Sequence, residues 1–224
     1  MSPSEFMKAA LLIDFDGTIV NVDTAEVAMD LFADPDWRRI DEALENGEVT
    51  FEESLRKEFA MIKVSQERIL GELDRVVVLR PHFQQLVDCC RSNHIPLTIV
   101  SGGLDFCIQH FLDRDDWLKY IEICAPKSQL TENGYSLTFP KLFSISSLNF
   151  KDDLVRHEKM RGKRVYYIGN GFGDYAAARE SNYAFAIKGS KLEELCRIHN
   201  VPHEGIDDFQ RVVDVLNRQA HRNF

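Results

Sequence analysis

Five strand-length apolar runs constrain the fold of this chain more than any other feature. They are AALLIDF (9–15), PLTIV (96–100), YIEIC (120–124), RVYYIG (164–169) and AFAI (184–187). Most are apolar throughout, as strands buried on both faces of a sheet should be. Because helical patterns separate these runs, the sequence predicts an α/β fold with a doubly wound parallel sheet.

The predicted helices show residues at helical spacing that are apolar except for His157. The sets are Leu104, Ile108, Phe111 and Leu112; Leu154, His157 and Met160; and Leu192, Leu195 and Cys196. A last helix is expected to begin after Asp207 or Asp208 as its N-cap.

The interval between the first two runs, residues 16–95, is several times longer than one crossover connection needs. It contains TFEESLRKEFAMI (50–62), where Thr50 and Glu53 have the spacing of a capping box. A further helix is expected to start at Ser65. The sequence therefore predicts a core formed by residues 7–20 and 80–224, with an inserted small helical cap formed by residues 21–79.

A second, smaller insertion has the pattern of a short β-hairpin. In KSQLTENGYSLTFP (127–140), Asn133 and Gly134 stand between alternating apolar and polar residues. Asn-Gly is the strongest short-range signal for a tight hairpin turn.

Composition excludes several classes of partner. The chain has 224 residues and a net charge of −9, without a long Lys or Arg run, which argues against nucleic-acid binding. No stretch approaches the roughly 18 apolar residues of a membrane span. The 5 cysteines form no CxxC pair, and a reducing cytoplasmic location is expected. Residues 1–6, MSPSEF, precede a second Met and are left out of the fold prediction, and the oligomeric state is left open.

Two aspartates follow the first predicted strand in LLIDFDGTIV. Asp14 and Asp16 occupy alternate positions, so both carboxylates are expected on one side at the carboxyl edge of the sheet. Two acids this close would repel each other strongly unless a cation lay between them. A divalent metal is the expected partner.

The DxDGT motif that ends this strand resembles the hallmark of the haloacid dehalogenase superfamily of phosphohydrolases. Ser101 and Gly102 in LTIVSGG resemble the phosphate-binding segment of that family, and Lys151 in NFKDDLVRH resembles its phosphate-binding lysine. The loop in YYIGNGFGD, with Asp174, resembles the family's acidic metal loop. The four elements occur in the family's order and span essentially the whole chain.

The resemblance implies a Mg²⁺-dependent phosphatase that acts on a small phosphorylated metabolite. Asp14 would be the nucleophile that forms an aspartyl-phosphate, and Asp16 the general acid and base. Asp14, the backbone carbonyl of Asp16, and Asp174 would ligate Mg²⁺. In many relatives the loop reads GDGxND, whereas here Asn170 replaces the first acid. Its amide oxygen is expected to bind the metal or a metal-bound water, without contributing negative charge.

The stretch LENGEVTFEESLRKEFAMIK, including Phe51, resembles the cap of phosphoserine phosphatases. Those enzymes carry a glutamate where this chain has Asp23, and an arginine for the substrate carboxylate where it has Glu58. Arg56 cannot replace that arginine, because two residues along a helix rotate the side chain by roughly 200°. Asp23, Phe51 and Glu58 are therefore the predicted substrate-selecting residues, and Glu58 disfavours a carboxylate-bearing substrate such as phosphoserine.

The C-terminal half resembles the methionine-salvage enol phosphatases of the same superfamily. The resemblance lies in SGGLDF, in TFP within the hairpin insertion and in the final segment LEELCRIHNVPHEGIDDFQRVVDVL. Three alternatives stay open: a phosphoserine phosphatase, a phosphotransferase using the same intermediate, and a non-catalytic phosphometabolite-binding protein.

Overall fold

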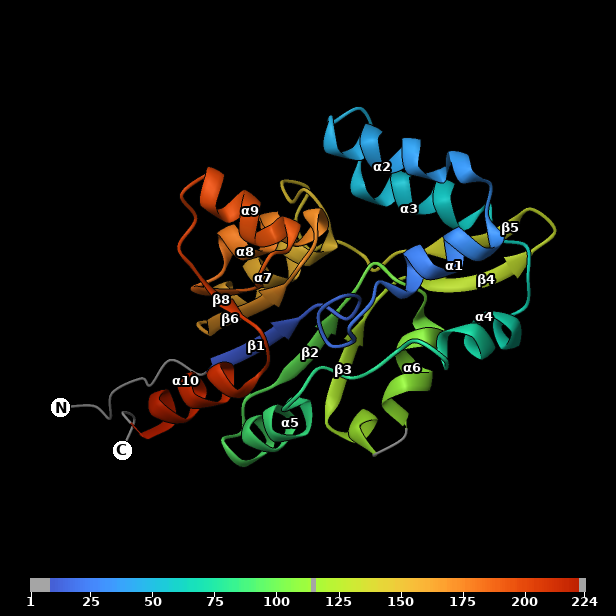
Figure 1. Ribbon diagram of the computed structural model, residues 1–224. Coiled ribbons are helices and arrows are strands. Elements are labelled where there is room, and N and C mark those ends of the chain that lie inside the picture. Colours follow the sequence, from blue (N-terminus) through green and yellow to red (C-terminus); the bar gives the residue numbers. More distant parts are fainter. Residues whose placement is uncertain (1–8, 114–115, 222–224) are drawn as a thin grey trace.

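A six-stranded parallel sheet forms the centre of the molecule in the computed structural model, which describes residues 9–113 and 116–221 (Figure 1). The strand order is β3-β2-β1-β6-β7-β8. The strands are β1 (Ala9–Ile13), β2 (Leu97–Val100), β3 (Ile121–Cys124), β6 (Arg164–Gly169), β7 (Tyr183–Ile187) and β8 (His203–Ile206). The predicted fold class is confirmed, whereas the MSPSEF segment lies outside the described residues.

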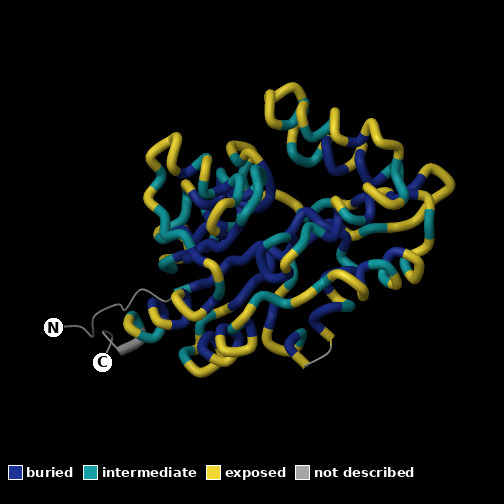
Figure 2. The backbone as a smooth tube through the Cα atoms, in the orientation of Figure 1, coloured by how far each residue is buried: buried dark blue, intermediate teal, exposed yellow. Residues whose placement is uncertain are grey.

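Helices cover both faces of the sheet. One face packs on α5 (Phe83–Ser92), α6 (Asp105–Leu112) and α10 (Gln210–His221), and the other on α7 (Phe150–Met160), α8 (Tyr175–Glu180) and α9 (Lys191–Ile198). Leu11 and Ile13 belong to the first of these apolar layers and Leu12 to the second. Successive side chains of a strand point to opposite faces, which explains why β1 is apolar throughout. Figure 2 shows this buried centre surrounded by exposed helix faces and loops.

Four α-helices occupy the segment between β1 and α5. They are α1 (Thr24–Phe32), α2 (Arg38–Glu45), α3 (Phe51–Phe59) and α4 (Gln66–Leu73). The capping box of Thr50 and Glu53 at α3 is confirmed, and Ser65 is the N-cap of α4. Sequence patterns did not identify α1 and α2, and the division into core and cap at residues 21–79 stays a prediction.

The predicted hairpin is confirmed as β4 (Lys127–Thr131) and β5 (Gly134–Thr138), an antiparallel pair. Its turn lies one residue earlier than expected, because Gly134 pairs with Thr131 as the first residue of β5. Gly134 has φ +92°, and a Cβ there would lie 2.0 Å from the carbonyl oxygen of Ala60. The glycine is therefore required where the hairpin packs on the end of α3.

The hairpin also binds the side chain of Arg56. Its guanidinium donates to the Leu137 carbonyl oxygen at 2.6 Å and lies over the Phe139 ring, 4.5 Å from the centroid. The side chain is thus bound to the hairpin, in keeping with the expectation that Arg56 does not replace the missing substrate-binding arginine.

Strand β8 was missed because its sequence, HEGI, has no apolar run. It lies at the edge of the sheet beside β7, where three of its four residues are only partly buried. The short helical turns are η1 (Pro35–Trp37), η3 (Trp117–Lys119) and η4 (Phe172–Asp174). Within the described ranges, no helix combines the length and the apolar character that a membrane crossing requires.

Candidate active site

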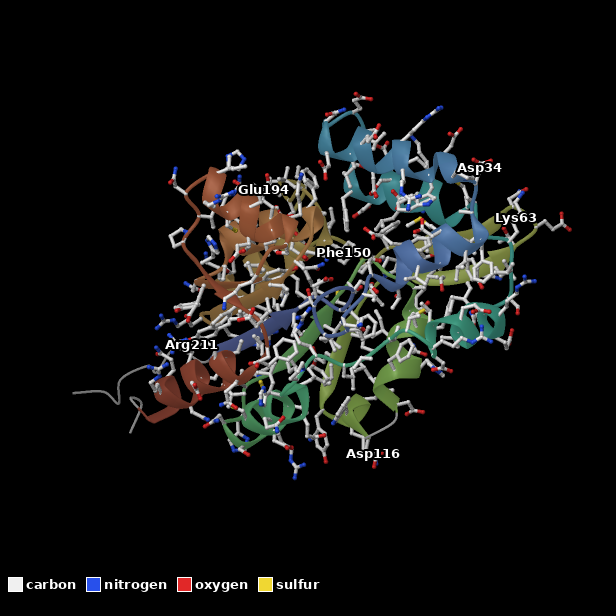
Figure 3. All side chains as sticks on the ribbon, viewed as in Figure 1. Asp34, Lys63, Asp116, Phe150, Glu194 and Arg211 are labelled. Carbon is white, nitrogen blue, oxygen red and sulfur yellow. The ribbon has the colours of Figure 1, made fainter. Side chains whose placement is uncertain are left out.

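The residues predicted to carry the chemistry meet at the carboxyl edge of three adjacent strands. Asp14 and Asp16 follow β1, Ser101 follows β2 on one side, and the η4 turn with Asp174 follows β6 on the other. The strand order reverses between β1 and β6, and crevices at such switch points are where open α/β sheets bind ligands. Lys151 reaches the same point from the first turn of α7, next to Phe150, which Figure 3 labels near the centre of the molecule.

A buried ion cluster joins β1, α7 and η4. The Lys151 Nζ lies 2.8 Å from Asp14 Oδ1 and 2.6 Å from Asp174 Oδ1, and all three side chains are at most 6% exposed. Burial, together with the charge of Asp174, raises the pKa of Asp14 to about 8 despite the nearby ammonium. Burial lowers the pKa of Lys151, but the two carboxylates outweigh it and raise that pKa above its ordinary value, so the lysine stays charged.

The start of α7 fixes the position of this lysine. The Asn149 side chain accepts hydrogen bonds from the Lys151 and Asp152 backbone N–H groups as the N-cap, and the Asp152 side chain completes a capping box. The cap thereby sets where the first turn begins and directs Lys151 toward β1.

Asp16 has a separate set of partners. Its Oδ1 accepts from the Thr24 backbone N–H at 3.0 Å and from the Thr24 hydroxyl, and its Oδ2 accepts from the Ser101 hydroxyl at 3.2 Å. Burial raises the pKa of Asp16, and these hydrogen bonds oppose the shift. A raised pKa favours the protonated form that a general acid needs.

Asp174 holds the loop after β6 and the lysine together. Its Oδ1 accepts from Lys151 Nζ and from the Tyr167 hydroxyl at 2.7 Å, and its Oδ2 accepts from the backbone N–H groups of Asn170 and Gly171. Both oxygens thus have two donors each. Direct ligation of a metal would require Asp174 to release one of them, so this geometry favours Asp174 as the residue that positions Lys151.

Asn170 faces Asp14 across the hydroxyl of Thr18. The Thr18 Oγ1 lies 3.0 Å from Asn170 Oδ1 and 3.3 Å from Asp14 Oδ2. A hydroxyl has one proton, so it can satisfy only one of these two oxygens at a time. Two converging hard oxygens with one shared proton suit a Mg²⁺ ion, which binds through one or two carboxylates with water and substrate phosphate. Within the described residues, no cluster of three or more His, Cys, Asp or Glu side chains is arranged to hold a metal, so the fit depends on this mixed set of oxygens.

Phe51 closes the site from α3. A Cβ on Gly102 would lie 2.9 Å from the Phe51 ring, and a Cβ on Gly173 would lie 2.5 Å from it. Phe51 thus packs against the loops after both β2 and β6, and any side chain larger than hydrogen at either glycine would displace the ring.

Three functional contacts escaped sequence reasoning. Thr24 binds Asp16, Tyr167 binds Asp174, and the Arg80 guanidinium donates to the backbone oxygens of Gly17 and Thr18 at 2.7 Å. Thr24 lies near the start of the predicted cap, Arg80 directly follows the cap, and Tyr167 lies within an apolar strand. No local pattern marks any of them as a partner of the site.

A cavity of about 530 Å³ adjoins these residues, and its walls include Asp23, Phe51 and Glu58. Asp23 is the N-cap of α1, and its carboxylate accepts from the backbone N–H groups of Ala25 and Glu26. Burial and the charge of Asp16 raise the pKa of Asp23 well above its usual range. The predicted metal-binding and substrate-selecting residues therefore line one cavity together with Gly102 and Lys151, whereas Ser101 is fully buried behind this lining and contacts Asp16.

Glu58 is buried in the α3 wall of this cavity, with 3% of its surface exposed. Its Oε1 has no hydrogen-bond partner within the described part of the chain. Burial, followed by the charges of Asp41 and Glu26, raises the pKa of Glu58 to about 8.

We expect Glu58→Gln to change the pH dependence of stability. In the parent, the folded-state pKa lies above the unfolded value, so stability falls as pH rises between about 4.5 and 8. Glutamine does not titrate. As pH rises through this range, the free energy of unfolding of the variant should therefore increase relative to that of the parent by on the order of a few kcal/mol. Urea unfolding at pH 5, 6.5 and 8 measures this difference. The exposed substitution Glu42→Gln on α2 is the control, and its stability should depend on pH as the parent's does. If the stability of Glu58→Gln also followed the parent's pH dependence, the raised pKa of Glu58 would be contradicted.

Comparison with known proteins agrees with this geometry. A family model described as haloacid dehalogenase-like hydrolase matches residues 11–179. The 2-hydroxy-3-keto-5-methylthiopentenyl-1-phosphate phosphatase of Brevibacillus brevis is 27% identical over 218 residues, which cover 94% of this chain and 96% of that protein. The polyol phosphate phosphatase of Saccharomyces cerevisiae is 23% identical over 221 residues, 92% of each protein.

Solved structures show the same fold. A phosphoserine phosphatase, determined as an analogue of its phospho-aspartyl intermediate, aligns with a TM-score of 0.66 at 18% identity and covers 93% of this chain and 99% of that one. The predicted resemblance is confirmed: the chain is an enzyme that belongs to the haloacid dehalogenase-like hydrolase family.

Proposed function

We propose that the protein hydrolyses a small phosphate monoester through an aspartyl-phosphate on Asp14. The observation that carries this proposal is the position of Lys151, whose ammonium contacts Asp14 while Asp16 lies two residues away and bonds Ser101. A nucleophile, a proton donor and phosphate-binding groups thus meet at one cavity. The curated relatives are named phosphatases, which supports the assignment.

In the first step, an Asp14 carboxylate oxygen attacks phosphorus. The new O–P bond forms as the P–O bond to the substrate's leaving oxygen breaks, and Asp16 donates its proton to that oxygen. Lys151, the Ser101 hydroxyl and the Gly102 backbone hold the phosphoryl oxygens and offset their charge. The leaving group departs as an alcohol or enol.

In the second step, the now deprotonated Asp16 takes a proton from a water molecule. The water oxygen attacks phosphorus, the Asp14–phosphate bond breaks, and inorganic phosphate is released. Asp14 returns as a carboxylate and Asp16 as an acid, so the cycle is closed.

Asp14, the Asp16 backbone carbonyl and Asn170 would hold a Mg²⁺ ion, with Asp174 as a further ligand only if it releases a donor. A bound Mg²⁺ would supply positive charge that offsets repulsion between the attacking carboxylate and the phosphoryl oxygens. The protein's own contribution is to hold the charged Lys151 beside Asp14, because the ammonium favours the ionised carboxylate that attacks.

A panel of phosphate esters tests the proposal. It should include p-nitrophenyl phosphate, phosphoserine, polyol phosphates and 2-hydroxy-3-keto-5-methylthiopentenyl-1-phosphate, each with Mg²⁺, and release of inorganic phosphate is the readout. A new ester formed in the presence of an acceptor alcohol would favour a phosphotransferase. Tight binding without turnover of any ester would favour a non-catalytic protein and overturn the proposal.

We expect Asn170→Asp to lower the Mg²⁺ concentration that gives half-maximal activity. The added carboxylate would face Asp14 across Thr18 and contribute charge that the amide lacks. Thermal shift titration with Mg²⁺ gives a second readout, since a ligand that binds only the folded state stabilises it by an amount that increases with the logarithm of its affinity. Ca²⁺ titration and the exposed Asn46→Asp serve as controls, and an equal or higher Mg²⁺ requirement in Asn170→Asp would contradict the prediction.

A further inference from the structure

The wall of the cavity opposite the sheet has charges of one sign. Residues 21–79 contribute five charged side chains to the lining, and all are acidic: Asp23, Glu26, Asp41, Glu45 and Glu58. The basic lining residues, Arg80, Lys151, Lys188 and Lys191, all lie outside that segment. The cavity therefore has mixed charges at its phosphate end, where Lys151 lies among Asp14, Asp16 and Asp174, and only acidic side chains on the wall formed by residues 21–79.

The basic side chains have partners elsewhere. Lys151 contacts Asp14 and Asp174, Arg80 holds backbone carbonyls, and Lys188 pairs with Asp207. Lys191 pairs with Glu45 at 3.0 Å, so Glu45 already has a basic partner. Four acidic side chains of this wall remain, and none forms an ion pair with a described basic residue, although the charge of Arg38 acts on Glu26 and Asp41.

Glu58 provides a second, independent observation that points to a ligand at this wall. Its side chain is almost fully buried in the cavity wall, and Oε1 has no donor within the described residues. A buried carboxyl oxygen without a donor is costly, and a ligand that brings a donor and positive charge would satisfy it. Glu26 and Asp41 line the same cavity as Glu58, and their charges help raise the pKa of Glu58.

We propose that Glu58, with Glu26 and Asp41, binds a protonated amine at the end of the substrate remote from the phosphate. The inference rests on the proposed phosphatase function and deepens it: the substrate class is an aminoalkyl phosphate monoester. An ammonium group offers three donors and the charge that this wall lacks. A hydroxyl end offers one donor without charge, and a carboxylate end meets like charge.

The test compares esters that differ only at the remote end. Aminoalkyl phosphates of two to four carbons are each measured against the hydroxyalkyl phosphate of equal length, by kcat/KM and by calorimetric affinity. We expect the amine to be preferred by roughly 10- to 100-fold at one length, the usual contribution of a charge-assisted hydrogen bond. Phosphoserine should be a poorer substrate than 2-aminoethyl phosphate, because its added carboxylate faces the acidic wall.

Glu58→Gln and Asp41→Asn should each lower the amine-to-hydroxyl ratio, Glu58→Gln by about 10-fold. Glu42→Gln removes one charge from the outer face of the same segment and should keep the parent's ratio; far-UV circular dichroism confirms that each variant is folded. Two substitutions are compared so that, if one variant fails to fold, the amine-to-hydroxyl ratio of the other still tests the proposal.

The outcomes separate this inference from the proposed function. A parent that hydrolyses p-nitrophenyl phosphate but shows a ratio near one at every length overturns amine recognition and leaves the phosphatase assignment intact. The same holds for a preference that neither variant changes. If no ester is hydrolysed, the proposed function fails, and the calorimetric preference for the amine still decides the recognition claim.

Discussion

We expect Asp14→Asn to lose at least about 1000-fold in kcat toward every phosphate ester, the largest effect that the site predicts. The amide cannot form an acyl phosphate, while the Lys151 ammonium, the Ser101 hydroxyl and the cavity remain. The KM or Kd of the ester should therefore change by only a few-fold. Steady-state kinetics with p-nitrophenyl phosphate, and calorimetric binding of a slow ester, measure the two quantities.

Asp16→Asn provides the matched comparison, because it removes the proton donor and keeps the nucleophile. Proton transfer contributes typically about 100- to 10,000-fold. The loss should be smaller for p-nitrophenyl phosphate than for an alkyl phosphate, since a good leaving group needs no proton. If Asp14→Asn kept more than a tenth of the parent's kcat, or if both variants depended equally on the leaving group, these two roles would be assigned incorrectly.

Local sequence patterns located the residues at strand ends and helix starts. Asp14, Asp16 and Ser101 follow apolar runs, and parallel strands present their carboxyl ends at one edge, so the gathering of these side chains follows from the fold class. Lys151 was placed by its position at a helix start, and Asn149 confirms that start by capping α7.

Two of the missed contacts join residues only eight and seven positions apart, and they depend on how the loops after the strands fold rather than on helix or strand periodicity. The Thr24 hydroxyl, at the start of α1, donates a hydrogen bond to Asp16 in the loop after β1. The Tyr167 hydroxyl, within β6, donates one to Asp174 in the turn that follows β6. Neither pair has a spacing that a sequence pattern records. Edge strand β8 was missed for a related reason: strand periodicity reflects burial, and an edge strand is buried only in part.

The role of Asp174 shows how geometry sharpens an assignment made from a motif. Its place in GNGFGD marks it as one acid of a metal loop. The motif does not show whether Asp174 binds the metal itself or holds a neighbouring residue in place. Four donors on its two oxygens favour support of Lys151, which makes Asn170 the more important candidate for the metal.

Lys151→Met should impair both stability and catalysis. The ammonium is the shared partner of two buried carboxylates, Asp14 and Asp174. Removing one partner of a buried ion pair typically costs about 3–5 kcal/mol, and losing a donor aimed at developing charge typically lowers kcat about 100- to 1000-fold. Lys57→Met on the exposed face of α3 is the matched control and should change neither quantity appreciably.

The cost of Lys151→Met should depend on pH, and that dependence identifies its cause. Without the ammonium, burial and the charge of Asp174 raise the folded-state pKa of Asp14 further, so protonation of Asp14 relieves the repulsion at low pH and stability falls as pH rises. Urea unfolding should therefore show a larger deficit at pH 8 than at pH 5. The double variant Lys151→Met/Asp174→Asn should recover part of that deficit, because one of the two stranded charges is gone, while kcat stays low. A deficit that is equal at both pH values, or unaffected by Asp174→Asn, would mean that Lys151 acts through packing rather than through its charge.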